Sequence, residues 1–278
     1  MDDVVQDSKS DEATLRMIAA ETFDAYNGGG RQIQPFVPRH PAFSLDDGYQ
    51  VSALVHGLRV ARGFKPVGRK IGFTNRRIWP EYGVYAPNWG YVYDRTTHDI
   101  AQPMRLAPYP EPKIEPEIQF GLSAVPLPGM DDAALLNCIE WVALGYEIVQ
   151  SIFPGWKFSP ADTNAANAMH GGLLVGTKHA VRGREAEWLQ ALTTFEVELY
   201  RDGVLMDRGH ATNVMEGPLS TLRYTMDLLA RDRFNPPLAA GEIISTGTLT
   251  RALTVLAGET WVTKVTGADL DEITLRFC

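Results

Sequence analysis

Three glutamates in two short segments have the residue type and spacing for chemistry. Glu115 and Glu117 lie two positions apart in segment 113–120, and because side chains alternate along a strand, an extended segment puts both carboxylates on one face. Glu147 has apolar neighbours on both sides in segment 141–150, so we expect its carboxylate to be largely enclosed. An enclosed carboxylate is expected to be protonated, paired with a cation or bound to a metal ion. With no Cys or His adjacent to them, three carboxylates suit a hard divalent ion, Mg²⁺ or Mn²⁺, with positions left open for water or substrate.

The spacing of the first two glutamates is not specific by itself. Glu196 and Glu198 repeat it, but the turn residues 202–203 follow directly, which predicts a hairpin whose glutamates face solvent. On spacing alone the first pair could also lie on a solvated surface, and it is the apolar setting of Glu147 that favours a site. Pro116, between the first two glutamates, cannot donate a ladder hydrogen bond, which predicts an edge strand or a strand start for this segment.

Lys70 and His170 are further candidates, and the residues around each also allow a structural role. Lys70 stands beside Arg69 and before the glycine-containing pair 71–72, from which it would reach an anionic ligand, although a lone lysine is more often a surface charge. His170 precedes two glycines, 171–172, and is either a local general base or a structural histidine before a tight turn.

The elements that must position these residues divide the chain in two. Helical periodicity predicts one helix over about 11–26 and a second from Ser44 to Gly63. After residue 111 the period changes to the alternation of strands, which predicts an α+β protein with an N-terminal helical lobe, 1–67, and a β-rich catalytic body, 68–278. The predicted strands are 113–122, 141–151, 193–200, 204–210, 242–248, 259–266 and 271–277, with helices near 131–140 and 218–230.

Composition bounds the class of protein. In 278 residues, 34 Asp and Glu against 26 Lys and Arg leave a net charge of −8, which disfavours nucleic acid and anionic membranes as partners. Two cysteines cannot build a disulfide framework, the first twelve residues are acidic and polar rather than a secretory or mitochondrial signal, and no apolar run approaches the ~18 residues of a membrane span. The chain has no Gly-x-Gly-x-x-Gly motif, which disfavours an enzyme that binds a dinucleotide. These features predict a soluble, cytoplasmic protein, and they do not forbid an anionic small-molecule substrate.

Four segments together resemble the 2-keto-4-pentenoate hydratases, which belong with the 4-oxalocrotonate decarboxylases in the fumarylacetoacetate hydrolase superfamily. The segments 68–75, 82–90, 114–118 and 147–149 occur in the family's order, and the resemblance extends over most of residues 10–277. It implies a mixed β-roll or β-sandwich body with an N-terminal helical part. It also implies a homo-oligomer.

The resemblance implies roles for individual residues. It implies a catalytic lysine at Lys70, and the turn that contains Thr248 is similar to a superfamily turn that contacts the substrate carboxylate. It implies metal ligation by Glu115, Glu117 and Glu147.

One position departs from the hydratase pattern. Asn88 stands where these hydratases usually have an Asp that acts in acid–base chemistry. An amide cannot take up a proton at neutral pH, although it can orient a water molecule or donate a hydrogen bond. The departure therefore weakens the case for water addition more than the case for binding a metal or a pyruvyl group.

The leading hypothesis is a divalent-metal-dependent hydratase that acts on a 2-hydroxy-2,4-dienoate or 2-oxo acid of aromatic-compound catabolism through a metal-stabilised enolate. The nearest alternative is a C–C hydrolase of an acylpyruvate of the fumarylpyruvate or maleylpyruvate type, with His40 or His170 in water activation. A vinylogous decarboxylase needs no water activation, so Asn88 would be harmless there. A non-catalytic scaffold is a distant third class, because it has no reason to keep three converging acids. Arg76 or Arg77 could bind a second carboxylate of a diacid substrate.

Overall fold

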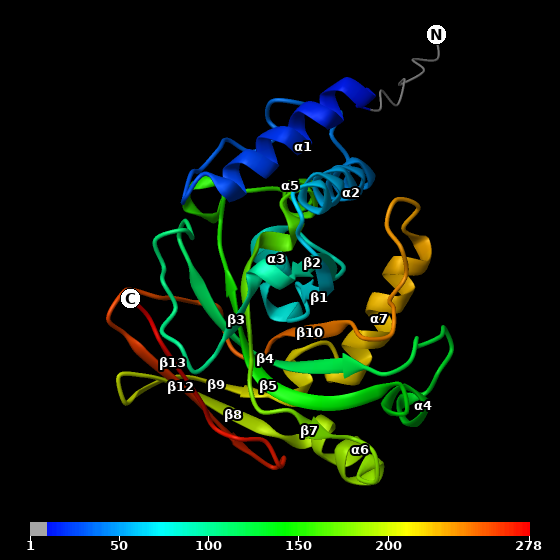
Figure 1. Ribbon diagram of the computed structural model, residues 1–278, viewed down its shortest axis with the longest axis vertical. Helices are drawn as coiled ribbons and strands as arrows, with labels where there is room; N and C mark the ends of the chain where they lie inside the picture. The colour runs from blue at the N-terminus through cyan, green and yellow to red at the C-terminus, as the bar shows by residue number, and fades with distance from the viewer. Residues whose placement is uncertain (1–9) are drawn as a thin grey trace.

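The computed structural model describes residues 10–278, apart from the side chain of Glu81 (Figure 1). The expectation that the amino terminus carries no targeting signal concerns mainly residues 1–9, which lie outside this part of the chain. Within the described part, no helix has both the length and the apolar character needed to cross a bilayer.

The two amino-terminal helices begin where their capping residues predict. The Asp11 carboxylate accepts a hydrogen bond from the backbone N–H of Thr14, and Ser44 forms a reciprocal capping box with Asp47. Both predicted helices are confirmed. The α-helices are α1 (Glu12–Asn27), α2 (Leu45–Ala61), α3 (Trp79–Tyr82), α4 (Asp132–Leu136), α5 (Pro160–Ala165), α6 (Glu185–Thr194) and α7 (Pro218–Arg231).

The strands form two sheets. The larger sheet has the order β2-β1-β10-β4-β5-β6-β3, with β11 pairing β4 and β7 pairing β5, and the smaller has the order β13-β12-β8-β9. The seven predicted strands correspond to β4, β5, β8, β9, β10, β12 and β13. The bounds are β1 (Pro66–Gly72), β2 (Asn88–Tyr93), β3 (Thr97–Asp99), β4 (Lys113–Leu122), β5 (Ile139–Val149), β6 (His170–Val175), β7 (His179–Ala180), β8 (Glu196–Arg201), β9 (Val204–His210), β10 (Ile243–Thr248), β11 (Leu253–Thr254), β12 (Thr260–Thr266) and β13 (Ile273–Arg276).

The main hydrophobic core joins the two sheets. Phe120 of β4, Leu199 of β8 and Trp261 of β12 belong to one buried cluster, to which α6 and α7 add Trp188 and Leu222. Figure 1 shows the smaller sheet lying against the larger one, with α7 along one side of the body. One face of β4 is therefore committed to the core, and the opposite face is left to carry Glu115 and Glu117.

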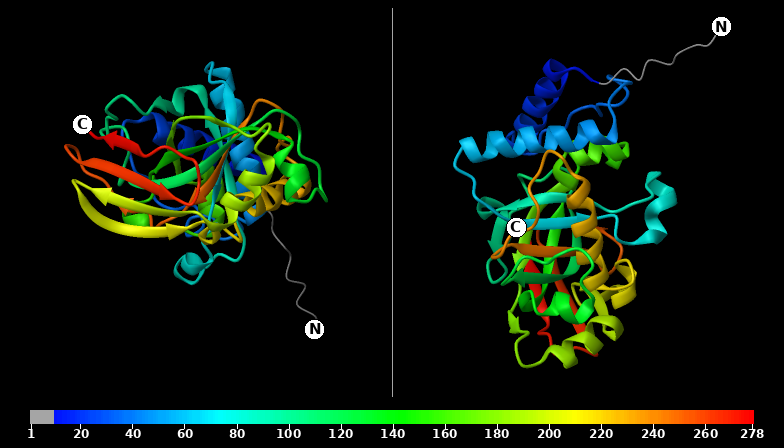
Figure 2. Two further views of the ribbon diagram at one scale, coloured as in Figure 1. Left: turned by 90° about the horizontal axis from the view of Figure 1, so that it is seen from below. Right: turned by 90° about the vertical axis from the view of Figure 1, so that its right-hand side faces the viewer.

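A second hydrophobic cluster lies at the helical end of the molecule. Ile18 of α1 and Val55 of α2 pack with Phe153 and with Ala165 of α5. Figure 2 shows α1 and α2 as a layer across one end of the β-rich body. This layer thus covers a segment, 152–169, that comes from the body; the division at residue 67 into two domains stays a prediction.

The expectation for Pro116 is wrong. β4 is an interior strand, with β5 on one side and β10 and β11 on the other. Proline is tolerated because it lies where β10 gives way to β11: Thr248 pairs with Glu117, Leu253 pairs with Ile114, and the Pro116 carbonyl accepts a hydrogen bond from the Leu249 N–H between them. The missing proline N–H thus falls in a gap of the ladder.

Candidate metal and substrate site

The strand register brings the three predicted glutamates together. Glu115 of β4 lies directly opposite Glu147 of β5, and Glu117 follows two positions along the same face of β4. One carboxylate oxygen from each glutamate lies within 4.8 Å of those of the other two. Glu117 and Glu147 are fully buried, and Glu115 is half-buried at the wall of a cavity. The predicted solvated pair lies elsewhere, on β8, an interior strand of the second sheet, where Glu196 is exposed and Glu198 is half-buried.

Glu117 is held by the end of β10. Its Oε2 atom accepts hydrogen bonds from the Ser245 hydroxyl at 2.5 Å and from the Gly247 backbone N–H at 3.0 Å. Gly247 has a φ of 93°, and a Cβ there would lie 1.9 Å from the Thr74 hydroxyl oxygen, so this position requires glycine. The other carboxylate oxygen, Oε1, is buried without a hydrogen-bond partner among the described residues. Glu117 is therefore oriented with one free oxygen.

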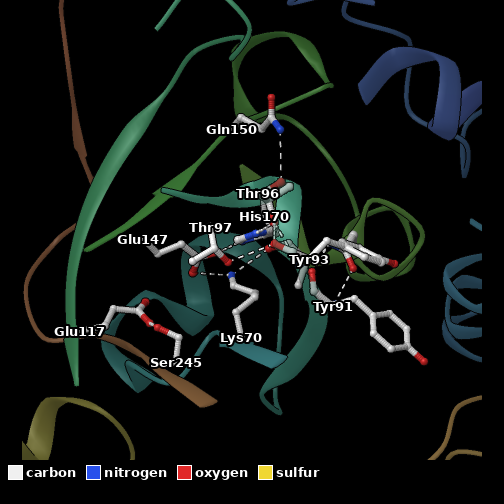
Figure 3. A network of polar contacts seen from close by, with 12 residues as sticks. Lys70, Tyr91, Tyr93, Thr96, Thr97, Glu117, Glu147, Gln150, His170 and Ser245 are labelled. Carbon is white, nitrogen blue, oxygen red and sulfur yellow. Dashed lines mark hydrogen bonds and ion pairs between the residues drawn. The ribbon is translucent and has the colours of Figure 1, made fainter. Parts of the chain in front are cut away.

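Glu147 lies between two nitrogen groups. Its Oε1 atom is 2.8 Å from Nδ1 of His170, and its Oε2 atom is 3.2 Å from the Lys70 ammonium nitrogen (Figure 3). The second ring nitrogen of His170, Nε2, lies 2.9 Å from the Thr96 hydroxyl. A neutral ring with its proton on Nδ1 donates to the carboxylate and fixes its rotation.

The Lys70 side chain is fixed by an unusual backbone segment. Its ammonium group, on β1, donates a 2.9 Å hydrogen bond to the carbonyl of Ala168. Asn167, Ala168 and Met169 all adopt positive φ values, between 49° and 62°, which is costly for residues with a Cβ. The Asn167 side chain supports this segment by pairing with both backbone groups of Tyr91, at 2.7 and 2.9 Å. Strained backbone therefore supplies the acceptor that positions the lysine.

Burial and mutual repulsion set the protonation of the glutamates in the absence of a cation. Burial raises the pKa of Glu115 to about 7; the Lys70 charge opposes this effect and the Glu147 charge adds to it. Burial and the two neighbouring carboxylates raise the pKa of Glu117 well above its usual range. Burial would lower the pKa of Lys70, but the three carboxylates outweigh it and raise that pKa, so the lysine is a cation. Burial lowers the pKa of His170, consistent with a neutral ring.

The residues present fit a divalent metal ion. The free Glu117 oxygen is a buried acceptor that no donor within residues 10–278 reaches, and the oxygen spacing matches ligands about 2.0–2.6 Å from a shared Mg²⁺, Mn²⁺ or Ca²⁺. A cation would also relieve the repulsion between two carboxylates placed directly opposite in a sheet. All three donors are carboxylates, which suit hard cations.

The cavity beside the glutamates carries several other predicted residues. Lys70, Glu115, Asn88 and Thr248 all line it. Asn88 donates hydrogen bonds from its amide nitrogen to Thr163 and Asn164, each at 3.1 Å, and its carbonyl oxygen is left without a partner among residues 10–278. A Cβ on Gly72 would lie 2.3 Å from that oxygen, so glycine keeps the space in front of it clear.

An aromatic wall continues the cavity away from the glutamates. Phe73, Tyr82, Trp156 and Phe158 line it, with the Tyr82 and Phe158 rings stacked at 5.5 Å. Lys113, at the start of β4, also lines it, and its ammonium lies 4.0 Å from the centre of the Trp156 ring. This part of the site therefore combines apolar surface with one cation.

Four predicted candidates do not line this cavity. His170 lies behind Glu147, in the wall of a separate cavity. His40 lies in the segment between α1 and α2, and is not among the lining residues. Arg76 and Arg77 are both exposed; Arg76 is paired with Glu216, and Arg77 lines a separate pocket by the second sheet. The Thr248 hydroxyl, although in the cavity wall, donates to the Thr250 carbonyl.

Several supporting residues escaped the sequence reasoning. Ser245 and Gly247 stand in the segment singled out for its threonine, and a hydroxyl followed two positions later by glycine is the signal that points to a carboxylate cradle. Thr96 and Ala168 act through a hydroxyl and a backbone carbonyl, and no sequence pattern marks either. Lys113 is the first residue of the glutamate strand, and in the sequence nothing distinguishes it from an ordinary charged residue at a strand end.

Comparison with known proteins agrees with the resemblance found in the sequence. No protein-family model matches the chain. It is 28% identical over 232 residues to a 2-hydroxyhexa-2,4-dienoate hydratase of Comamonas testosteroni, covering 82% of this chain and 85% of that protein. It is 28% identical over 259 residues to a 2-keto-4-pentenoate hydratase of Paraburkholderia phymatum, covering 93% of this chain and 96% of that protein. The resemblance inferred from the sequence is therefore confirmed.

Solved structures share the fold. A 4-oxalocrotonate decarboxylase from Pseudomonas putida G7, complexed with magnesium and adipate, has a TM-score of 0.87 at 24% identity, covering 98% of this chain and all of that one. A fumarylacetoacetate hydrolase family protein from Yersinia pestis has a TM-score of 0.51 at 17% identity, covering 77% of this chain and 94% of that one. A fumarylpyruvate hydrolase from Pseudomonas aeruginosa, in complex with Mn²⁺ and pyruvate, has a TM-score of 0.55 at 14% identity, covering 76% of this chain and 88% of that one. The predicted α+β fold of this superfamily is confirmed.

Proposed function

We propose that the protein is a divalent-metal-dependent lyase, a hydratase of a 2-hydroxy-2,4-dienoate or its 2-oxo tautomer. The observation that carries this proposal is the meeting of Glu115, Glu117 and Glu147 beside a buried lysine at a cavity wall. The similarity to hydratases over 82–93% of the chain supports the same reaction class. Mg²⁺ and Mn²⁺ are the proposed cofactors, since relatives of the same fold are complexed with these ions.

The glutamates and Lys70 have different roles in binding the substrate and stabilising its negative charge. A divalent ion held by the three glutamates would act as a Lewis acid on the 2-oxo oxygen of the substrate. Lys70, a cation only 3% exposed, would hold the substrate carboxylate or the enolate oxygen in a site of low dielectric, where its charge acts strongly. The Ala168 carbonyl and Glu147 keep its ammonium in place without a rearrangement during the reaction.

Asn88 would position the water molecule rather than activate it. Its free carbonyl oxygen can accept a hydrogen bond from water, but the amide cannot take the proton. In the hydratase the proton that water loses must therefore pass to another acceptor, and the enolate that forms on the substrate as water adds can take it. The aromatic wall would take the tail of the dienoate, because apolar and aromatic lining favours an unsaturated hydrocarbon chain over a second charge.

The same observation at Asn88 favours one second candidate, a vinylogous 2-oxo acid decarboxylase. That reaction breaks a C–C bond and forms an enolate without activating water. It therefore needs no general base at position 88, and a neutral amide there does not slow it. Lys113 would then bind near the departing carboxylate of a diacid substrate, since it is the cation on the aromatic side of the cavity.

One assay separates these reactions. The purified protein would be mixed with Mg²⁺ and, in turn, 2-hydroxypenta-2,4-dienoate, 4-oxalocrotonate and fumarylpyruvate. A 4-hydroxy-2-oxo acid product identifies the hydratase, CO₂ the decarboxylase, and pyruvate the C–C hydrolase. Turnover of none of the three, with Mg²⁺ and Mn²⁺ both tried, would contradict the proposal.

The substrate class, the localisation and the assembly are proposed from the similarity to the hydratases. The substrate is a small 2-oxo acid of aromatic-compound catabolism, the protein works in the cytoplasm, and it assembles as a homo-oligomer. Sedimentation at several protein concentrations tests the assembly, and a monomer at all of them would contradict it.

A further inference from the structure

A second cavity lies on the far side of His170 from the glutamates. It has a volume of about 200 Å³. Its wall includes His170, which contacts Glu147 from this side, and Thr96, whose hydroxyl pairs with Nε2 of His170. Gln150, also in the wall, donates a hydrogen bond to the His170 carbonyl (Figure 3). Asn27 and Arg95 in its wall are exposed, so the cavity reaches the surface.

Arg59 in this wall is a buried cation without an anion. It stands in the last turn of α2 and is only 4% exposed. Its Nε–H has no hydrogen-bond partner, and within residues 10–278 no carboxylate forms an ion pair with its guanidinium. The guanidinium instead lies over the rings of Tyr26, Phe64 and Tyr93, at 5.0, 5.7 and 4.8 Å from their centres.

The rings explain how Arg59 is oriented but not why a charge is kept there. Cation–π contacts recover only part of the hydration that a buried guanidinium loses, and an apolar side chain of similar length would pack in the same place. A second arginine, Arg95, lines the same cavity, and none of the other residues in the wall is acidic. The wall is thus positively charged in a protein whose net charge is −8.

We propose that this cavity binds a small oxyanion, a phosphate or a carboxylate, on Arg59. A guanidinium presents parallel N–H donors that match two oxygens of either group, and burial strengthens those hydrogen bonds. Arg95 would add a second charge from the exposed side. Because His170 forms part of the wall, the bound anion would lie next to the residue that orients Glu147, at a site separate from the substrate cavity.

Titration calorimetry with inorganic phosphate, and separately with succinate, tests this proposal on the full chain. The ionic strength is kept constant with sodium chloride, and a chelator is present so that no metal ion binds phosphate. The native protein is expected to bind at least one of the two anions, which also identifies whether phosphate or carboxylate is preferred. Arg59→Gln should weaken that binding at least about tenfold, the effect of losing charge-assisted hydrogen bonds.

Two further variants make the result specific. Arg62→Gln removes an exposed arginine from the same end of α2, outside the cavity wall, and should leave binding unchanged. Lys70→Met removes the cation of the substrate cavity and should also retain binding. If Arg59→Gln fails to fold, Arg95→Gln replaces it and is expected to weaken binding severalfold.

The proposal is overturned by either of two results. One is that the native protein binds neither anion above the chloride background, which leaves Arg59 as a packing residue among three rings. The other is that binding survives Arg59→Gln but disappears in Lys70→Met, which assigns the anion to the substrate cavity.

Discussion

The imidazole of His170 donates to the carboxylate of Glu147 across 2.8 Å, from the side opposite the substrate cavity. Sequence alone left His170 as either a general base or a structural residue. The contact supports a third role, that of a positioning residue for a proposed metal ligand. Groups of this kind hold the rotation and charge of a ligand without touching the substrate.

His170→Ala is expected to weaken Mg²⁺ binding about 10–100-fold, the usual effect of removing such a group. Saturating Mg²⁺ should restore most of the turnover, and His170→Asn, which keeps an N–H donor, should bind Mg²⁺ better than the alanine variant. Calorimetry and steady-state rates at several metal concentrations measure both. If turnover at saturating Mg²⁺ stays lost and one limb of the pH–rate profile disappears, His170 is instead a general base.

Glu115→Gln tests the carboxylate cluster directly. Replacing one of three converging carboxylates should lower turnover at least about 100-fold, because Lewis-acid stabilisation contributes several kcal/mol to the barrier. Glu196→Gln is the matched control, since Glu196 has the same i, i+2 spacing but faces solvent. Exhaustive chelation of the native protein should have the same effect as Glu115→Gln, and Mg²⁺ or Mn²⁺ should reverse it. Activity that survives chelation would disprove the metal site.

Metal binding should strengthen as the pH rises. Glu115, with a pKa of about 7, and Glu117, with a pKa well above its usual range, hold protons that a cation must displace. Below pH 7 calorimetry in buffers of different ionisation enthalpy should therefore detect proton release on Mg²⁺ binding. Affinity that does not change between pH 6 and pH 8 would show that the carboxylates are ionised before the ion arrives.

The metal-free protein should show the opposite dependence in its stability. The folded pKa of Glu115 lies above its unfolded value of 4.5, so the folded state binds the proton more tightly. The stabilisation that this gives is complete below about pH 4.5 and is lost as the pH rises through about 7. Denaturant unfolding in a chelator, over this range, should show the free energy of unfolding of the native protein falling more than that of Glu115→Gln.

Lys70→Ala should reduce turnover at least about 100-fold, the effect of removing one preorganised electrostatic donor. Saturating Mg²⁺ would offset the lost charge beside Glu147, so the circular dichroism spectrum should remain that of the native protein. A near-normal rate in a folded variant would show that Lys70 is not part of the reaction.

Asn88→Asp distinguishes hydration from decarboxylation. A carboxylate here would add a proton acceptor beside the substrate, and general-base assistance typically contributes 10²–10⁴-fold, so hydration should rise by up to about 100-fold. Decarboxylation should not gain, because it needs no base at this position. Product analysis of the variant against Asn88→Ala measures the ratio. An unchanged ratio would show that Asn88 does not contact the reacting water.

Part of this site could be predicted from local pattern alone. The alternation of residues 113–120 is enough to put Glu115 and Glu117 on one face, and the apolar neighbours of Glu147 are enough to bury it. The caps of α1 and α2 likewise depend on residues three positions apart. Each of these features is decided by neighbours in the chain, which is why the sequence by itself determined them.

Only the tertiary structure decided how those pieces meet. The antiparallel register that sets Glu115 opposite Glu147, the hydroxyl and N–H that hold Glu117, and the approach of Lys70 all join strands far apart in the chain. The interior position of Pro116 and the role of His170 also depend on strands that are far apart in the chain. Register and side-chain approach depend on the packing of a whole sheet, and no local period encodes them.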